Sequence, residues 1–309
     1  MQYHSLGAPM NRLLVAAGTL GAMLVSVLAG AVPAQSAAPA PAGPKVVGMS
    51  APANLWTQRL REVGACGAEA RRVFANLQSD GRSQSTIIQQ TVNSGMMPVV
   101  SYKVPSVATL NGGGYDAWLA KTRTYLDGLG VQVTATFWHE PHGDMSAADF
   151  RTGSKRFLDR VKAPRVAVGP ILNGWLLDRQ VSTFASYTDA TLLAGWDFVA
   201  VDSYQNGTQP RPGSLPPARA IPLLENWLDS VGQPAKPIGL GEYNGFTAAA
   251  IAAAGEAILS TPEVWFSLAW NSTGGTYAPL VGDRLSAYKT TKADSRAQRD
   301  AGCWTERDG

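Results

Sequence analysis

The feature that most constrains the fold is a regular alternation of short apolar segments with longer stretches of helical pattern. The apolar segments are rich in Val, Ile, Phe and Ala, and most of them stay apolar on successive residues. Strands that are buried on both faces have this composition. Eight such segments can be counted, at residues 45–50, 71–77, 97–104, 131–139, 165–172, 197–204, 237–242 and 264–270.

Stretches with helical spacing lie between these segments. Several begin at a good N-cap residue, such as Ser146, and several end at a glycine, such as Gly95 or Gly130. The expected helices cover residues 56–63, 83–94, 115–129, 147–161, 184–194, 220–231, 248–259 and 284–301. Strict alternation of strand and helix predicts a parallel sheet with right-handed crossovers.

The count of eight units favours a closed ring over an open, doubly wound sheet. We therefore expect the α/β class and a single (β/α)8 TIM barrel over residues 45–309, a length typical of that fold. A dinucleotide site has weak support, because Gly112-Gly113-Gly114 follows a loop rather than a first strand. The sequence gives no reason to expect a cofactor.

The amino-terminal residues are typical of an export signal. Residues 1–37 hold an apolar run at 13–28 and then small residues that suit cleavage near Ala34 or Ala37. The alternative is a membrane anchor, since the run nearly reaches transmembrane length. Gly and Ala dilute the run and favour the signal peptide. Residues 38–44 form a Pro/Ala linker, and we expect a secreted protein that leaves the membrane after cleavage.

The charges and the cysteines bear on the partners of the protein and on its crosslinks. The net charge is +3 and the basic residues are scattered, so a nucleic-acid partner has no support. Cys66 and Cys303 are the two cysteines, and in an oxidising compartment we expect them to form a disulfide. Because the first and last units of a barrel are neighbours, this bridge would close the ring. The alternative is two unrelated buried thiols. We expect a monomer.

Two glutamates stand in matching positions, each at the end of an apolar segment. Glu140 follows residues 136–139, Thr-Phe-Trp-His, and Glu242 follows residues 238–241, Ile-Gly-Leu-Gly. By the count above they end the fourth and seventh strands, so both belong to the carboxyl face where barrel enzymes place their sites. Hydrolysis of a glycosidic bond needs such a pair of carboxyl groups. The alternative is that each glutamate is a solvated loop residue or an ion-pair partner.

These motifs resemble the retaining glycoside hydrolases of the large (β/α)8 clan. The run Trp138-His139-Glu140 is most similar to glycoside hydrolase family 26, typified by β-mannanases, in which a histidine precedes the first glutamate. The resemblance follows the strand order of the whole mature chain, but its specific part is a few residues per motif. It implies that Glu140 is the acid/base and Glu242 the nucleophile, with carboxyl groups about 5–5.5 Å apart.

The resemblance also implies sugar-binding residues. It implies that His139 bonds the nucleophile or the sugar, and that Tyr204 orients the nucleophile. Strict strand alternation would point His139 away from Glu140, so the strand must end or bulge there. We expect Trp270 to form an apolar floor under the sugar. Ordinary core packing is the alternative for His139 and Trp270; Trp138 and Tyr102 are weaker candidates for substrate contact.

The residues after the glutamates depart from the family. Pro-His-Gly-Asp follows Glu140 and Tyr-Asn-Gly-Phe follows Glu242, which leaves the substrate open among β-mannan, β-glucan and xylan. The leading hypothesis is a secreted, endo-acting retaining glycosidase whose partner is a polysaccharide or oligosaccharide. One alternative is a non-catalytic sugar-binding barrel. Another is a metal-dependent hydrolase built on His139 and His142, although no third His or Cys cluster accompanies them.

Overall fold

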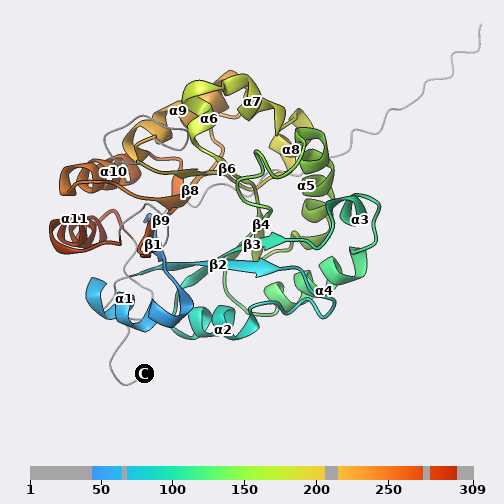
Figure 1. Ribbon diagram of the computed structural model, residues 1–309, viewed down its shortest axis with the longest axis horizontal. Coiled ribbons are helices and arrows are strands. Elements are labelled where there is room, and N and C mark those ends of the chain that lie inside the picture. The colour runs from blue at the N-terminus through green and yellow to red at the C-terminus, as the bar shows by residue number, and fades with distance from the viewer. Residues whose placement is uncertain (1–43, 65–67, 206–214, 274–278, 298–309) are drawn as a thin grey trace, which may run out of the picture. The chain divides into compact units, whose positions relative to one another are not determined.

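The computed structural model describes residues 44–64, 68–205, 215–273 and 279–297. In these residues, nine parallel strands form one sheet in the order β5-β4-β3-β2-β1-β9-β8-β7-β6. The strands curl into a ring, and the helices lie outside it (Figure 1). The strands are β1 Val46–Ser50, β2 Ala70–Asn76, β3 Met97–Lys103, β4 Val133–Phe137, β5 Val166–Val168, β6 Ile171–Asn173, β7 Val199–Ser203, β8 Ile238–Tyr243 and β9 Val264–Trp270.

The ring closes through β5 and β6, which together form the expected fifth strand. Gly169 and Pro170 separate them, because proline has no N–H to donate to a sheet. The backbone still bridges both neighbours: Gly169 N donates to the carbonyl of Ala135 in β4, and Ala200 N in β7 donates to Pro170 O. A Cβ on Gly169 would lie 2.3 Å from Phe198 O, so only glycine fits this crossing. The predicted (β/α)8 barrel is confirmed.

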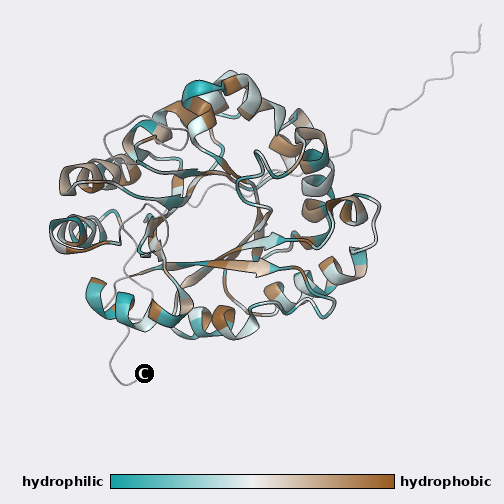
Figure 2. Cartoon of the chain, in the orientation of Figure 1, coloured by the Kyte–Doolittle hydropathy of each residue, from teal (hydrophilic) through white to brown (hydrophobic). Residues whose placement is uncertain are grey.

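The helices follow the strands in the expected order. They are η1 Ala53–Leu55, α1 Trp56–Val63, α2 Ser85–Asn93, α3 Val107–Asn111, α4 Asp116–Asp127, α5 Ala147–Val161, α6 Trp175–Arg179, α7 Val181–Ser186, α8 Ala190–Gly195, α9 Pro217–Ser230, α10 Ala248–Ser260 and α11 Gly282–Ala293. The helices carry both hydrophilic and hydrophobic residues, as a layer between sheet and solvent requires (Figure 2). Among the described residues, no helix is long and apolar enough to cross a bilayer.

Two of the predicted helices differ from the structure. The single helix expected at 184–194 is two helices, α7 and α8. They are separated because the Asp189 side chain accepts a hydrogen bond from Leu192 N and so starts a new helix there. The last helix ends at Ala293, because the Asp294 carboxylate accepts from the backbone N–H of Arg296 and turns the chain.

The interior of the barrel changes character along its axis. Near the amino ends of the strands it is apolar, with buried residues Val46, Ala70, Val99, Ile171, Phe198, Ala200, Phe266 and Leu268 in one cluster. Toward the carboxyl ends, the positions of the same alternation are polar and buried: Ser50, Arg72, Ser101, Thr136 and Asp202. The apolar layer seals the barrel, and the polar layer above it supports chemistry at the carboxyl face.

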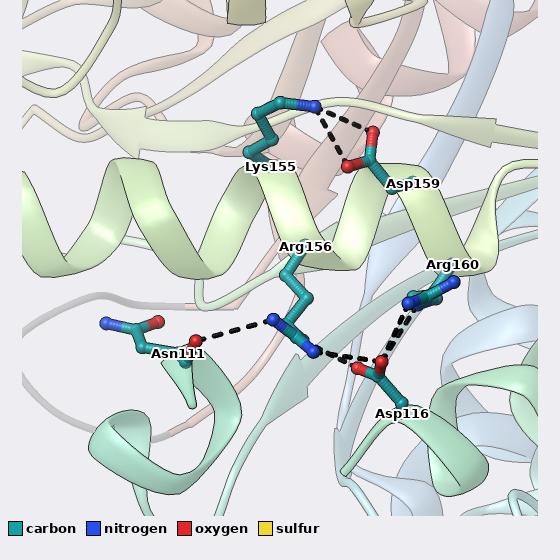
Figure 3. Close-up of polar contacts among 6 residues, drawn as sticks. All are labelled: Asn111, Asp116, Lys155, Arg156, Asp159 and Arg160. Carbon is teal, nitrogen blue, oxygen red and sulfur yellow. Dashed lines mark hydrogen bonds and ion pairs between the residues drawn. The ribbon is translucent and has the colours of Figure 1, made fainter. Parts of the chain in front are cut away.

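The glycine triplet 112–114 serves packing between helices. A Cβ on Gly113, which has φ +89°, would lie 2.1 Å from the Arg156 guanidinium. Arg156 of α5 bonds both carboxylate oxygens of Asp116 at the start of α4, at 2.6 and 2.9 Å, and Arg160 bonds the same carboxylate (Figure 3). Gly113 therefore leaves room for the Arg156 guanidinium, which joins α5 to the start of α4.

Three predictions concern parts of the chain outside the described residues. These are the signal peptide at residues 1–37, most of the linker, and both cysteines of the expected Cys66–Cys303 disulfide. All three remain predictions.

Candidate active site

Glu242 points into the barrel because β8 contains a β-bulge. Val201 of β7 pairs with Leu240, but the next residue, Asp202, pairs with Glu242, so Gly241 is one extra residue in β8. Without the bulge, Glu242 would face the helices as Leu240 does. A Cβ on Gly241 would lie 2.4 Å from Asp202 Oδ1, and the bulge therefore requires glycine.

The Glu242 carboxylate is buried, and each of its oxygens accepts a hydrogen bond. Ser50 Oγ, at the end of β1, donates to Oε1 at 2.5 Å, and the Tyr204 hydroxyl, just after β7, donates to Oε2. Burial raises the pKa of Glu242, whereas the Arg72 guanidinium and these two hydrogen bonds act to lower it. Three groups thus favour the ionised form of a fixed carboxylate.

The chain around Glu140 has a different backbone from that of a strand. β4 ends at Phe137, two residues before the predicted end, because Trp138 and Glu140 have φ +46° and +50°. Non-glycine residues rarely adopt this region, and such residues cluster at functional sites. Glu140 N still donates to Ile171 O of β6 at 2.9 Å, which ties the turn to the barrel rim. The predicted break in strand alternation at His139 is confirmed.

The Glu140 side chain is half-buried and suited to hold a proton. Burial raises the pKa of Glu140 to about 7, and the negative charge of Glu242 adds to that shift. The charge of Glu242 can act in this way only because the barrel brings the two carboxyl groups together. The raised pKa lets Glu140 keep its proton toward neutral pH, whereas the two hydrogen bonds and Arg72 favour the ionised form of Glu242.

Arg72 is the cation of this cluster, and the sequence analysis missed it. It lies in β2, is 3% exposed, and donates from Nη1 to Ser101 Oγ of β3 at 2.6 Å. Its charge lowers the pKa of Glu140, Glu242 and Asp202, although burial outweighs it in all three. The available signal was two consecutive arginines inside an apolar strand segment. Ser50, the other missed residue, ends its strand with no such signal.

Asp202 is a third buried carboxyl group in the polar layer. It lies in β7 beside the bulge and is 2% exposed. Burial raises its pKa well above the usual range, and the charges of Glu140 and Glu242 add to this effect. This shift favours the neutral form of Asp202, in which it adds no negative charge beside Glu242.

His139 lies against the aromatic ring of Phe74 from β2. The two ring centroids are 4.9 Å apart and the rings are tilted by 55°. Burial, together with the charges of Arg72 and Lys103, lowers the pKa of His139 to about 3, so the imidazole is neutral. Among the described residues its Nδ1 is buried and has no hydrogen-bond partner.

His142 has different surroundings from His139. Its ring packs edge-on against Trp175 at 5.4 Å, and its Nδ1 lies 3.4 Å from the Tyr187 hydroxyl. The two imidazoles therefore contact different neighbours. In the described part of the chain, no group of three His, Cys, Asp or Glu side chains is arranged to hold a metal ion.

The tryptophan candidates occupy two places at the carboxyl end of the barrel. Trp270 ends β9, pairs with Ser50 in the sheet, and meets the Tyr204 ring edge-on at 6.0 Å, so it lies beside the groups that hold Glu242. Trp138 is half-buried; its Nε1 donates to Asp144 Oδ2 at 2.8 Å, and Lys103 Nζ lies 4.7 Å from its ring centroid.

The prediction that Tyr102 contacts the substrate is wrong. Tyr102 is fully buried on the outer side of β3, where its ring packs 5.9 Å from that of Phe157 in α5. Side chains alternate along a strand, and Ser101 takes the inward position in this part of β3. Tyr102 therefore packs between sheet and helix.

Comparison with known proteins adds evidence on the fold. No protein-family model matches the chain, and no curated protein matches it in sequence. Among solved structures, an endo-β-1,4-mannanase of glycoside hydrolase family 26 from Cellulomonas fimi has 13% identity and a TM-score of 0.57, over 83% of this chain and 72% of that one.

Two further structures give similar values. A fungal β-1,4-galactanase has 14% identity and a TM-score of 0.55, over 81% of this chain and 99% of its own. Cel5A of Thermotoga maritima, solved with mannotriose, has 10% identity and a TM-score of 0.54, over 79% and 97%. At these identities the likeness is one of fold, and it agrees with the predicted (β/α)8 barrel.

Proposed function

We propose that this protein is a retaining glycoside hydrolase of β-linked polysaccharides, with Glu242 as nucleophile and Glu140 as acid/base. The observation that carries the proposal is the contrast between the two carboxyl groups. Ser50 and Tyr204 hold Glu242 through hydrogen bonds, with Arg72 nearby, whereas burial raises the pKa of Glu140 to about 7. The three structural neighbours are an endo-β-1,4-mannanase, a β-1,4-galactanase and Cel5A bound to its substrate mannotriose, and they support the same reaction class.

The first step of the proposed reaction uses both groups together. Glu242 attacks the anomeric carbon while Glu140 gives its proton to the glycosidic oxygen, so the leaving sugar departs as a neutral alcohol. The product of this step is a covalent glycosyl ester of Glu242, whose formation removes the negative charge of the nucleophile.

The second step reverses the role of Glu140. Once Glu242 is esterified, its charge no longer raises the pKa of Glu140, and the ionised Glu140 can take a proton from water. That water attacks the anomeric carbon and releases Glu242, and two inversions leave the anomeric configuration unchanged. The mechanism expects carboxyl groups about 5–5.5 Å apart.

The proposed setting is extracellular. The predicted signal peptide at residues 1–37 supports export, and an exported hydrolase meets polysaccharides too large to enter a cell. We propose endo action on a β-mannan, β-glucan or xylan, in line with the endo-mannanase among the structural neighbours.

A polysaccharide screen tests the proposal. Purified protein is incubated with β-mannan, β-1,4-galactan, mixed-linkage and β-1,3-glucan, and xylan, and reducing ends are counted beside a Glu242→Ala control. On the substrate that is cleaved, proton NMR of the first product should show the β-anomer before mutarotation. Early α-anomer would mean inversion, and failure of the wild-type protein on every polysaccharide would contradict the proposal.

A further inference from the structure

Phe74 is unusual among the phenylalanines of this chain. Of the eight, six are at most 2% exposed, whereas Phe74 is 41% exposed and Phe246 is 42% exposed. Phe246 follows β8 in a loop, but Phe74 belongs to β2, where the residues on either side of it, Val73 and Ala75, are buried. A large apolar ring held open to solvent by a rigid strand leaves burial energy unused, and its position decides what it can bind.

The direction of the Phe74 side chain follows from its strand. Ala70 belongs to the interior apolar cluster, and Arg72, two residues on, bonds Ser101 inside the barrel. Phe74 is two residues further toward the carboxyl end and therefore lies on the same inward side. It stands above the polar layer, at the end of the barrel where the two glutamates lie.

Two neighbours hold the Phe74 ring in place. The Arg72 guanidinium carbon lies 4.6 Å from the ring centroid, and the neutral His139 ring packs against it at 4.9 Å. His139 is adjacent in sequence to Glu140. Phe74 is therefore connected through a single side chain to the residue that protonates the leaving oxygen, and its remaining surface is open.

We propose that Phe74 is a sugar-binding platform that takes one neutral pyranose unit of the polysaccharide, on the β2 side of the two glutamates. The inference rests on the proposed function. The apolar C–H face of a β-linked pyranose stacks on an aromatic ring, and the ring is already ordered by Arg72 and His139, so little entropy is lost on binding. Phe74 is thus a specificity-determining residue for the chain that Glu140 and Glu242 cleave.

The test compares four variants on the polysaccharide that the wild type cleaves best. Phe74→Tyr keeps the ring, Phe74→Leu keeps apolar volume without it, and Phe74→Ala removes both. Val231→Ala is the control, because Val231 is an exposed apolar residue at the end of α9, on the opposite face of the barrel. Melting temperatures verify folding, and kcat/KM is measured for each protein.

The ring-dependent pattern is the expected result. Phe74→Leu and Phe74→Ala should lose about tenfold in kcat/KM, chiefly through KM, whereas Phe74→Tyr should stay within about threefold of wild type. Val231→Ala should match the wild type. Equal activity of Phe74→Leu and Phe74→Tyr would overturn the platform while leaving the proposed function intact. A wild type that cleaves no polysaccharide would instead overturn the proposed function and this inference with it.

Discussion

The two glutamates occupy opposite kinds of environment although both follow apolar segments. Glu242 lies within a strand, is 4% exposed, and has a donor on each oxygen. Glu140 lies after its strand ends, in a turn with left-handed residues, and is half-buried. The comparison shows how one barrel separates two chemically identical groups. Hydrogen bonds and a cation favour the ionised form of Glu242, and burial beside that charge favours the protonated form of Glu140.

Removal of the proposed nucleophile should have the largest effect. Glu242→Ala should lower kcat by at least about 10⁴-fold on every substrate, because no covalent intermediate can form. Azide should restore some activity by direct displacement and give an α-glycosyl azide, identified by NMR. Wild-type-like turnover would contradict the assignment.

The effect of removing the proposed acid/base should depend on the leaving group. Glu140→Ala should lose about 10²–10⁴-fold on polysaccharides, whose leaving sugars need a proton, and far less in the first step on aryl glycosides with acidic leaving groups. On aryl glycosides azide should give the β-glycosyl azide, because the intermediate still forms there but no longer has a base to activate water. Azide products of swapped stereochemistry in the two variants would mean that the two roles are reversed.

Loss of a donor to Glu242 should have an intermediate effect. Ser50→Ala and Tyr204→Phe each remove one hydrogen bond to a charged group, worth about 1.5–3 kcal/mol, and should lower kcat/KM by about 10–100-fold. Because both bonds lower the pKa of Glu242, their loss should move the acidic limb of the kcat/KM profile to higher pH. An unmoved acidic limb in both variants would show that the bonds do not set the ionisation of Glu242.

The smallest effect should be on stability and should depend on pH. The folded-state pKa of Glu140 is about 7 against 4.5 for the free group, so the folded protein binds this proton more tightly and loses stability as pH rises between those values. Glu140→Gln cannot ionise and therefore avoids this loss. Its unfolding free energy minus that of the wild type should be about 1–3 kcal/mol larger at pH 8 than at pH 4.

Chemical denaturation at the two pH values measures this difference. Glu256→Gln in α10 is the matched control, because the Arg296 guanidinium lowers the pKa of that exposed carboxyl group and no gain at pH 8 is expected. An equal gain in both variants would show that the Glu140 effect does not arise from its own ionisation. In the active wild type, the same pKa should appear as a basic limb near pH 7 in kcat/KM.

The sequence alone determined the barrel and its two glutamates. Apolar runs of strand length alternating with helical stretches identify buried parallel strands, because burial on both faces leaves a local signature. The positions of Glu140, Glu242, Tyr204 and Trp270 at the ends of those runs followed from the same count, since carboxyl ends of parallel strands share one face.

Only the tertiary structure decided which side chains meet. The extra residue Gly241 turns Glu242 inward, and its presence is visible only when β8 is paired with β7. Arg72 and Phe74 face the interior of the barrel, whereas Tyr102 faces α5. A shift of one residue in strand register would move each of these side chains to the other face of the sheet. Which segments form strands is encoded locally. The direction, hydrogen-bond partners and burial of each side chain depend on residues far apart in the chain.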